Sequence, residues 1–64
     1  MGKKSIRRYG WSDKHKAPIL CIVTGEMVDG TKIWTECDES RNLIDPDTQY
    51  TLQTRGDWSE FVRF

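Results

Sequence analysis

The sequence predicts an all-β protein, a small antiparallel meander of four to five strands that curls into an open barrel after an extended basic N-terminal arm. Two stretches rich in Ile, Val, Thr and aromatic residues each contain a short glycine break, at Asp29-Gly30 and at Gly56-Asp57, as β-hairpins do. Neither stretch shows helical spacing. Gly25 lies inside the first stretch, where a bulge would let a long strand bend as a small barrel requires.

The first hairpin occupies residues 18–38 in this prediction. With residues 28–30 as its loop, Glu26 faces Lys32 as an opposite-charge pair and Gly30 takes the left-handed conformation. The predicted strands are 19–28 and 31–37. The inner face then carries Ile19, Cys21, Val23, Met27, Ile33 and Cys37. The outer face carries Leu20, Ile22 and Trp34.

The same register places Cys21 and Cys37 opposite one another, so a disulfide is one interpretation. In a short intracellular chain, however, two cysteines are more often buried free thiols. The sequence therefore favours two thiols that fill the core.

A second hairpin follows the connection formed by residues 38–48. The connection ends in a Pro-containing segment that fits a type I turn. The hairpin joins predicted strands 49–54 and 58–63 and pairs Leu52 with Phe61. Together the strands resemble a small SH3-like or Sm-like barrel, an analogy of fold that carries no functional weight.

Charge divides the chain into a basic arm, residues 1–17, and a small β domain, residues 18–64. The overall net charge is zero. Residues 1–16 contain six Lys or Arg against the single carboxylate Asp13, whereas residues 17–64 contain four against nine carboxylates. Such a split predicts either a basic arm for an anionic partner or two halves that neutralise each other.

The arm contains the stretch "RRYGW", which combines two cations, Arg7 and Arg8, with two aromatic rings, Tyr9 and Trp11. Cations can contact phosphates and rings can stack on bases, so the stretch predicts nucleic-acid binding, with RNA favoured. The predicted nucleic-acid-binding residues are Lys3, Lys4, Arg7, Arg8, Tyr9, Trp11, Lys14 and Lys16. A second interpretation is that the cations are only solvated while Tyr9 and Trp11 pack on the sheet, and we favour packing for Trp11.

A different hypothesis is a small regulatory or inhibitory protein that docks on another protein. Zero net charge is unusual for a dedicated nucleic-acid binder, and strand edges and aromatic residues can form a docking surface. The acidic connection would take part in such docking. The predicted partner-binding residues are Trp34, Glu36, Asp38 and Glu39.

Chemistry other than binding has little support in the sequence. The only histidine, His15, lies between two lysines, and the cysteines lack the paired spacing of a zinc site. The five glycines do not gather into a phosphate-binding loop. We therefore expect no enzyme activity, no cofactor or metal, no small-molecule substrate and no membrane partner. A basic start without a following apolar segment predicts a cytoplasmic protein.

Overall fold

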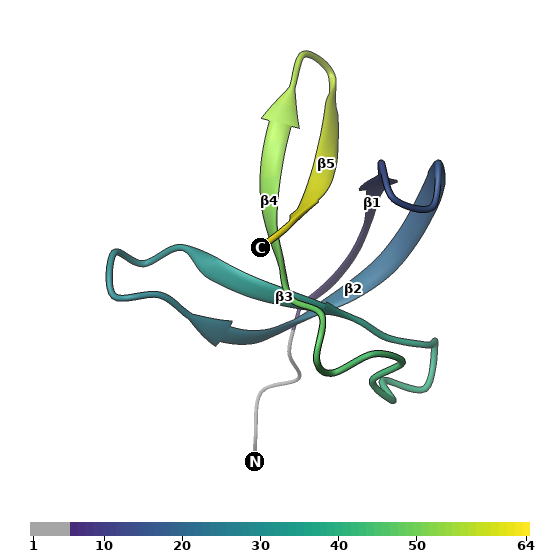
Figure 1. Ribbon diagram of the computed structural model, residues 1–64, viewed down its shortest axis with the longest axis vertical. Helices are drawn as coiled ribbons and strands as arrows, with labels where there is room; N and C mark the ends of the chain where they lie inside the picture. The colour runs from purple at the N-terminus through teal and green to yellow at the C-terminus, as the bar shows by residue number, and fades with distance from the viewer. Residues whose placement is uncertain (1–5) are drawn as a thin grey trace.

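Five strands follow one another along the chain and close into a barrel in the computed structural model, which describes residues 6–64 (Figure 1). The strands are β1 (Arg7–Ser12), β2 (Ala17–Glu26), β3 (Lys32–Glu36), β4 (Tyr50–Arg55) and β5 (Trp58–Arg63). The described residues contain no helix, and hence none long and apolar enough to cross a membrane. The all-β prediction is confirmed.

Closure of the barrel corrects the predicted open, fully antiparallel meander. Consecutive strands pair antiparallel, but β1 and β5 pair in parallel, with Trp11 beside Glu60 and Ser12 beside Phe61. In a meander of five strands the first and last run in the same direction, so joining them produces a parallel pair. The sheet is therefore mixed and closed.

Strand β1 was not expected, because the sequence analysis assigns residues 7–12 to an extended arm. The inner face of β1 carries Gly10 and Ser12, which are both buried. A Cβ atom at Gly10 would lie 2.7 Å from the ring of Phe61, so the close approach of β1 to β5 requires glycine. Small inner residues give no alternating apolar pattern, and this explains why the strand was missed.

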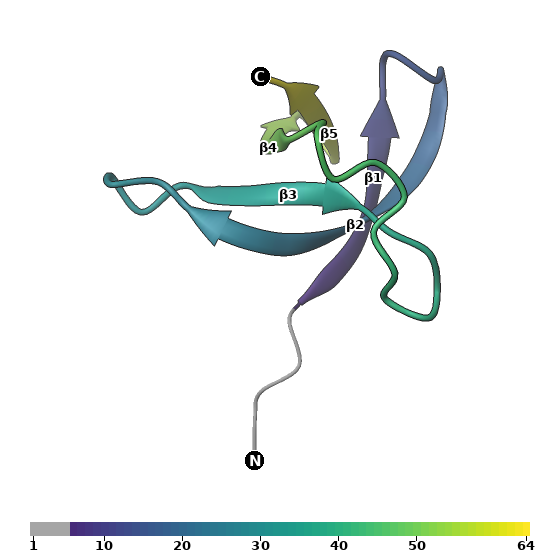
Figure 2. The same ribbon diagram turned by 60° about the horizontal axis from the view of Figure 1, so that its bottom comes forward.

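The β2–β3 hairpin has the predicted turn, and its tip projects away from the other strands (Figures 1 and 2). Glu26 pairs with Lys32, and their side chains approach to 3.8 Å. Gly30 has a φ of 93°, and the amide of Met27 donates to the carbonyl of Thr31 at 2.7 Å. These contacts confirm the predicted register at the tip.

The predicted bulge is present between Val23 and Gly25, and it shifts the rest of the hairpin by one residue. Val23 therefore faces Trp34, which lies in the core and not on the outer face as predicted. Cys21 faces Glu36 instead of Cys37. Both thiols are free and buried, as the sequence favours.

The core is a cluster of mostly aromatic side chains inside the barrel. Its buried members are Ile19, Cys21, Trp34, Tyr50 and Phe61, with Val23 and Leu52 packed against them. The ring of Phe61 lies 5.5 Å from that of Trp34 and 6.1 Å from that of Tyr50, both tilted or edge-on. These are favourable geometries for aromatic pairs. Phe61 thus connects β5 to β3 and β4, opposite the predicted partner Leu52.

Candidate nucleic-acid interface on the outer face of β1

The outer face of β1 carries three of the predicted nucleic-acid-binding residues. Because side chains alternate along a strand and Gly10 and Ser12 face inward, Arg7, Tyr9 and Trp11 face outward. Arg8 alternates to the face of Gly10 and Ser12, but it is exposed near the start of β1 and lines the groove at the Arg7 end as well. On the neighbouring strand β2, Leu20 lies opposite Tyr9 and Pro18 lies opposite Trp11.

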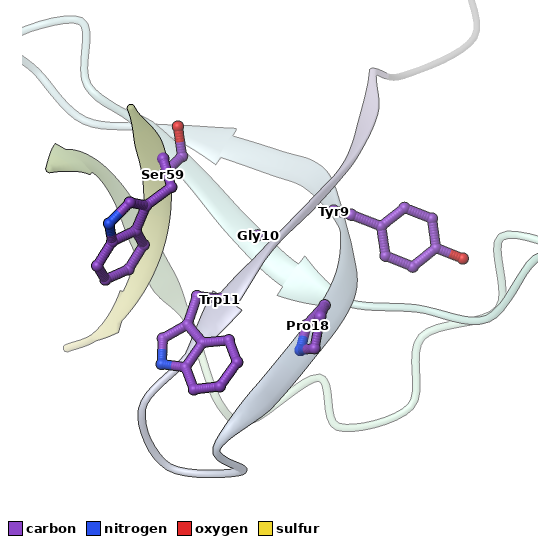
Figure 3. A pocket seen from close by; sticks show the side chains of 6 residues that line it. Tyr9, Gly10, Trp11, Pro18 and Ser59 are labelled. Atoms are coloured by element: carbon purple, nitrogen blue, oxygen red, sulfur yellow. The ribbon is translucent and has the colours of Figure 1, made fainter. Parts of the chain in front are cut away.

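An apolar groove lies at the Trp11 end of this face. It has a volume of about 460 Å³, and its lining residues are Tyr9, Gly10, Trp11, Pro18, Trp58 and Ser59. We call it the aromatic groove. Tyr9 is 61% exposed and Trp58 is 50% exposed, whereas Trp11 is half-buried. Figure 3 shows the Trp11 ring near Pro18 and the Tyr9 ring directed away from both.

A second groove lies at the Arg7 end of the same face. It has a volume of about 620 Å³, and its lining residues are Ile6, Arg7, Arg8, Tyr9, Leu20, Glu39 and Arg41. We call it the basic groove, since it contains three arginines and one carboxylate. The Nη1 atom of Arg7 donates a hydrogen bond to the backbone carbonyl of Glu39 at 2.6 Å. This contact ties the connection after β3 to β1 and orients the Arg7 guanidinium.

Tyr9 lines both grooves, so they adjoin at this residue. The structure thus places cations at one end of the β1 outer face and indole rings at the other.

The remaining predicted cations lie elsewhere. Lys14 and Lys16 are exposed in the turn after β1, beyond Trp11, and the ammonium of Lys16 lies 3.5 Å from the Asp13 carboxylate. Lys3 and Lys4 lie outside the described residues. The structure therefore brings together Arg7, Arg8, Tyr9 and Trp11 from the predicted set.

The predicted partner-binding residues do not form one exposed surface. Trp34 is only 5% exposed, inside the barrel. The carboxylate of Glu36, at the end of β3, lies 3.5 Å from Nε2 of His15. Glu39 is exposed and lines the basic groove.

Asp38 has a structural role in the connection. Its Oδ1 accepts hydrogen bonds from the backbone amides of Ser40 and Asn42, each at 2.9 Å. The bond from the Asn42 amide is the main reason that the pKa of Asp38 lies below its usual value. The ionised carboxylate therefore holds the loop that places Glu39 beside Arg7.

The Cys21 thiol in the core has a raised pKa. Burial, with the nearby Glu36 as a smaller cause, raises the pKa of the Cys21 thiol to about 12. A thiol with this pKa is protonated at neutral pH and is a poor nucleophile. Within residues 6–64, no three His, Cys, Asp or Glu side chains are grouped so that they could hold a metal ion.

Trp58 and Arg41 are site residues that the sequence did not predict, and Trp58 could have been found. It is the first residue of β5, and it lies three positions before the inward-facing Phe61. An odd separation along a strand places two side chains on opposite faces. The predicted pairing of Leu52 with Phe61 therefore already implied that Trp58 faces outward.

Comparison with known proteins adds no relative: no family, no curated protein and no solved structure matches this chain.

Proposed function

We propose that this protein is a non-enzymatic binding module that holds nucleic acid, with RNA favoured, on the outer face of β1. The observation that carries the proposal is the position of Tyr9, which lines both the aromatic groove and the basic groove. A chain of nucleotides offers phosphates and flat bases in alternation. It can therefore fill both grooves at once.

The basic groove suits phosphate. A guanidinium presents a planar set of donors that matches a phosphate group in a two-point contact. Arg7 faces outward, Arg8 lines the groove from the other face of β1, and Arg41 enters from the connection. One carboxylate, that of Glu39, offsets part of this charge, so the groove attracts an anion less strongly than three isolated arginines would.

The aromatic groove suits bases. Stacking of a base on an aromatic side chain contributes about 1–3 kcal/mol and tolerates any base, because every base has a flat face. Trp58 is an exposed ring of this groove, Trp11 stands half-buried beside Pro18, and Tyr9 adds an exposed ring at the border of the groove. RNA is favoured because proteins usually recognise it through unstacked bases in single-stranded segments. The resemblance of the fold to an SH3-like or Sm-like barrel remains a prediction and carries no weight here.

The first test measures binding of a labelled single-stranded RNA by fluorescence anisotropy across a salt series. About three phosphate contacts predict a log–log slope of roughly −2 for a single strand. The variant Arg8→Ala should weaken binding and reduce the slope by about 0.7. Arg63→Ala, which removes an exposed cation at the end of β5, is the matched control and should leave the slope unchanged.

Absence of binding at low salt would contradict the proposal. An equal change of slope in Arg8→Ala and Arg63→Ala would show that binding depends on charge anywhere on the barrel. In that case the basic groove would have no special role.

Docking on another protein remains the alternative, and one observation favours it. Leu43 and Ile44 are 44% and 57% exposed in the acidic connection, where they form an apolar pair beside carboxylates. The closed barrel disfavours docking through the edges of β1 and β5, which pair with each other. A protein captured from nuclease-treated lysate and lost with Leu43→Ala plus Ile44→Ala would support this alternative over the nucleic-acid proposal.

A further inference from the structure

The spacing of side chains along β1 limits the form of nucleic acid that can use the site. Successive outward residues of an antiparallel strand are about 7 Å apart, twice the rise per residue. Tyr9 and Trp11 are such a pair, in the antiparallel pairing of β1 with β2. Neighbouring bases in a duplex rise by about 3.4 Å along each strand. Two adjacent stacked bases therefore cannot rest on both residues.

The rings themselves are placed for separate contacts. The Tyr9 ring is directed away from Trp11 and over the β2 side, so neither ring covers the other (Figure 3). Trp58 joins Trp11 in the aromatic groove from the opposite side, since β5 pairs with β1 along its other edge. The surface thus offers two base sites, one at Tyr9 and one between β1 and β5.

We propose that the outer face of β1 binds a single strand in which two neighbouring bases are unstacked from each other. One base lies on Tyr9, the next enters the aromatic groove beside Trp11 and Trp58, and the adjoining phosphate reaches the basic groove. This inference rests on the proposed function and adds the form of the ligand. It excludes an intact duplex, whose base faces are covered by the base pairs above and below.

The length of the site follows from the same geometry. Arg7 and Trp11 are four residues apart in β1, which corresponds to about 14 Å. Three outward side chains, about 7 Å apart, span this distance. With one nucleotide at each side chain, the site holds two to three extended nucleotides. The basic and aromatic grooves then hold consecutive parts of one strand, with Tyr9 at their boundary.

The experiment compares three probes at the same low salt: a labelled oligothymidylate, an abasic strand with the same backbone, and a duplex of the same length. Each probe is about ten nucleotides long, within the range of site sizes of small single-strand-binding barrels. The abasic strand keeps every phosphate but offers nothing to stack. We expect the oligothymidylate to bind at least about 10-fold more tightly than either other probe.

Substitutions at the two base sites test whether these sites cause the difference in affinity between the probes. Tyr9→Ala and Trp58→Ala should each weaken binding of the oligothymidylate by about 10-fold and leave the abasic strand unaffected. Tyr9→Phe keeps the ring and should bind as the unchanged protein does. Leu43→Ala removes a similarly exposed apolar residue outside both grooves and should have no effect.

The outcomes separate this inference from the proposed function. Equal affinity for the oligothymidylate and the abasic strand, or tighter binding of the duplex, would overturn the single-strand inference while the nucleic-acid function stands. No binding of any probe at low salt would overturn both. A melting curve for each variant shows whether a loss of binding comes from unfolding. If Tyr9→Ala unfolds, Tyr9→Phe shows whether a folded protein that keeps the ring still binds.

Discussion

The two faces of the short strand β1 differ in the size and the exposure of their side chains. Inward, Gly10 and Ser12 are small and buried, and Gly10 lies directly against the core ring of Phe61. Outward, Tyr9 is mostly exposed and adjoins one groove lined by arginines and another lined by tryptophans. One face closes the barrel, and the other carries the proposed binding site.

This difference allows one strand to be a part of the scaffold and to carry the proposed site. The close packing on the inner face depends on the absence of side-chain bulk, so it places no demand on the outer residues. The outer residues can therefore be large, charged or aromatic. We expect substitutions on the inner face to change stability and substitutions on the outer face to change binding.

The largest expected effect is that of Phe61→Ala. The ring is 2% exposed and packs against the rings of Trp34 and Tyr50. It also lies directly against Gly10. Loss of such a buried ring costs about 3–5 kcal/mol. A core in a chain of this size rarely supplies more than that, so the variant should be largely unfolded. Circular dichroism with urea titration measures this, and a cooperative native-like transition would contradict the account.

Gly10→Ala should have the next largest effect. The added Cβ would lie 2.7 Å from the Phe61 ring, which cannot move without disturbing its aromatic neighbours. Overpacking of this kind costs about 1–3 kcal/mol. Gly25→Ala is the control, since its Cβ would lie at an ordinary distance of 3.5 Å from Ile33. Equal loss of stability in both variants would show that the tight contact between β1 and β5 is unimportant.

Alkaline pH should lower the free energy of unfolding through a buried group. The pKa of Cys21 is raised by burial from 9.0 to about 12. Above pH 9 the unfolded chain therefore loses this proton while the folded chain keeps it, and stability falls between about pH 9 and pH 12. The loss from this group is about 1 kcal/mol at one pH unit above 9.

The pH prediction has its own control. In Cys21→Ala the decline of stability across this range should be shallower, although burial also raises the pKa values of Cys37 and Tyr50. Urea unfolding at a series of pH values measures the slope. An unchanged slope in the variant would mean that Cys21 is not the group responsible.

The smallest effect on stability is expected on the outer face. Trp58 is 50% exposed and contributes to none of the core ring pairs described above. Trp58→Ala should change the free energy of unfolding by no more than about 0.5 kcal/mol, as is usual at exposed positions. A loss comparable to that of Gly10→Ala would show that the aromatic groove is a part of the core and not a site.

The sequence was informative where hydrophobic pattern and turn chemistry agree. Glycine turns and β-branched residues predicted both hairpins, and the pairing of Leu52 with Phe61 was confirmed. The bulge near Gly25 was also predicted, but its effect on register was not carried to Trp34, which then appeared on the wrong face. A single inserted residue reverses every position beyond it.

The candidate site was predictable in part. Arg7, Arg8, Tyr9 and Trp11 were expected to act together, and the structure does bring them to one strand. The strand itself was hidden because Gly10 and Ser12 carry no apolar signal. The contribution of Trp58 depends on the pairing of β5 with β1, and that of Arg41 on the contact between the connection and Arg7, and no local pattern encodes either.

The central claim is that the outer face of β1 binds a ligand without supporting the fold. The most direct test is the double variant Tyr9→Ala plus Trp58→Ala, with melting and single-strand binding measured on the same sample. Our account predicts that affinity falls by about 100-fold, since two stacking contacts are lost. The melting temperature should change by no more than about 4 °C. Unchanged affinity in a folded double variant would contradict the account.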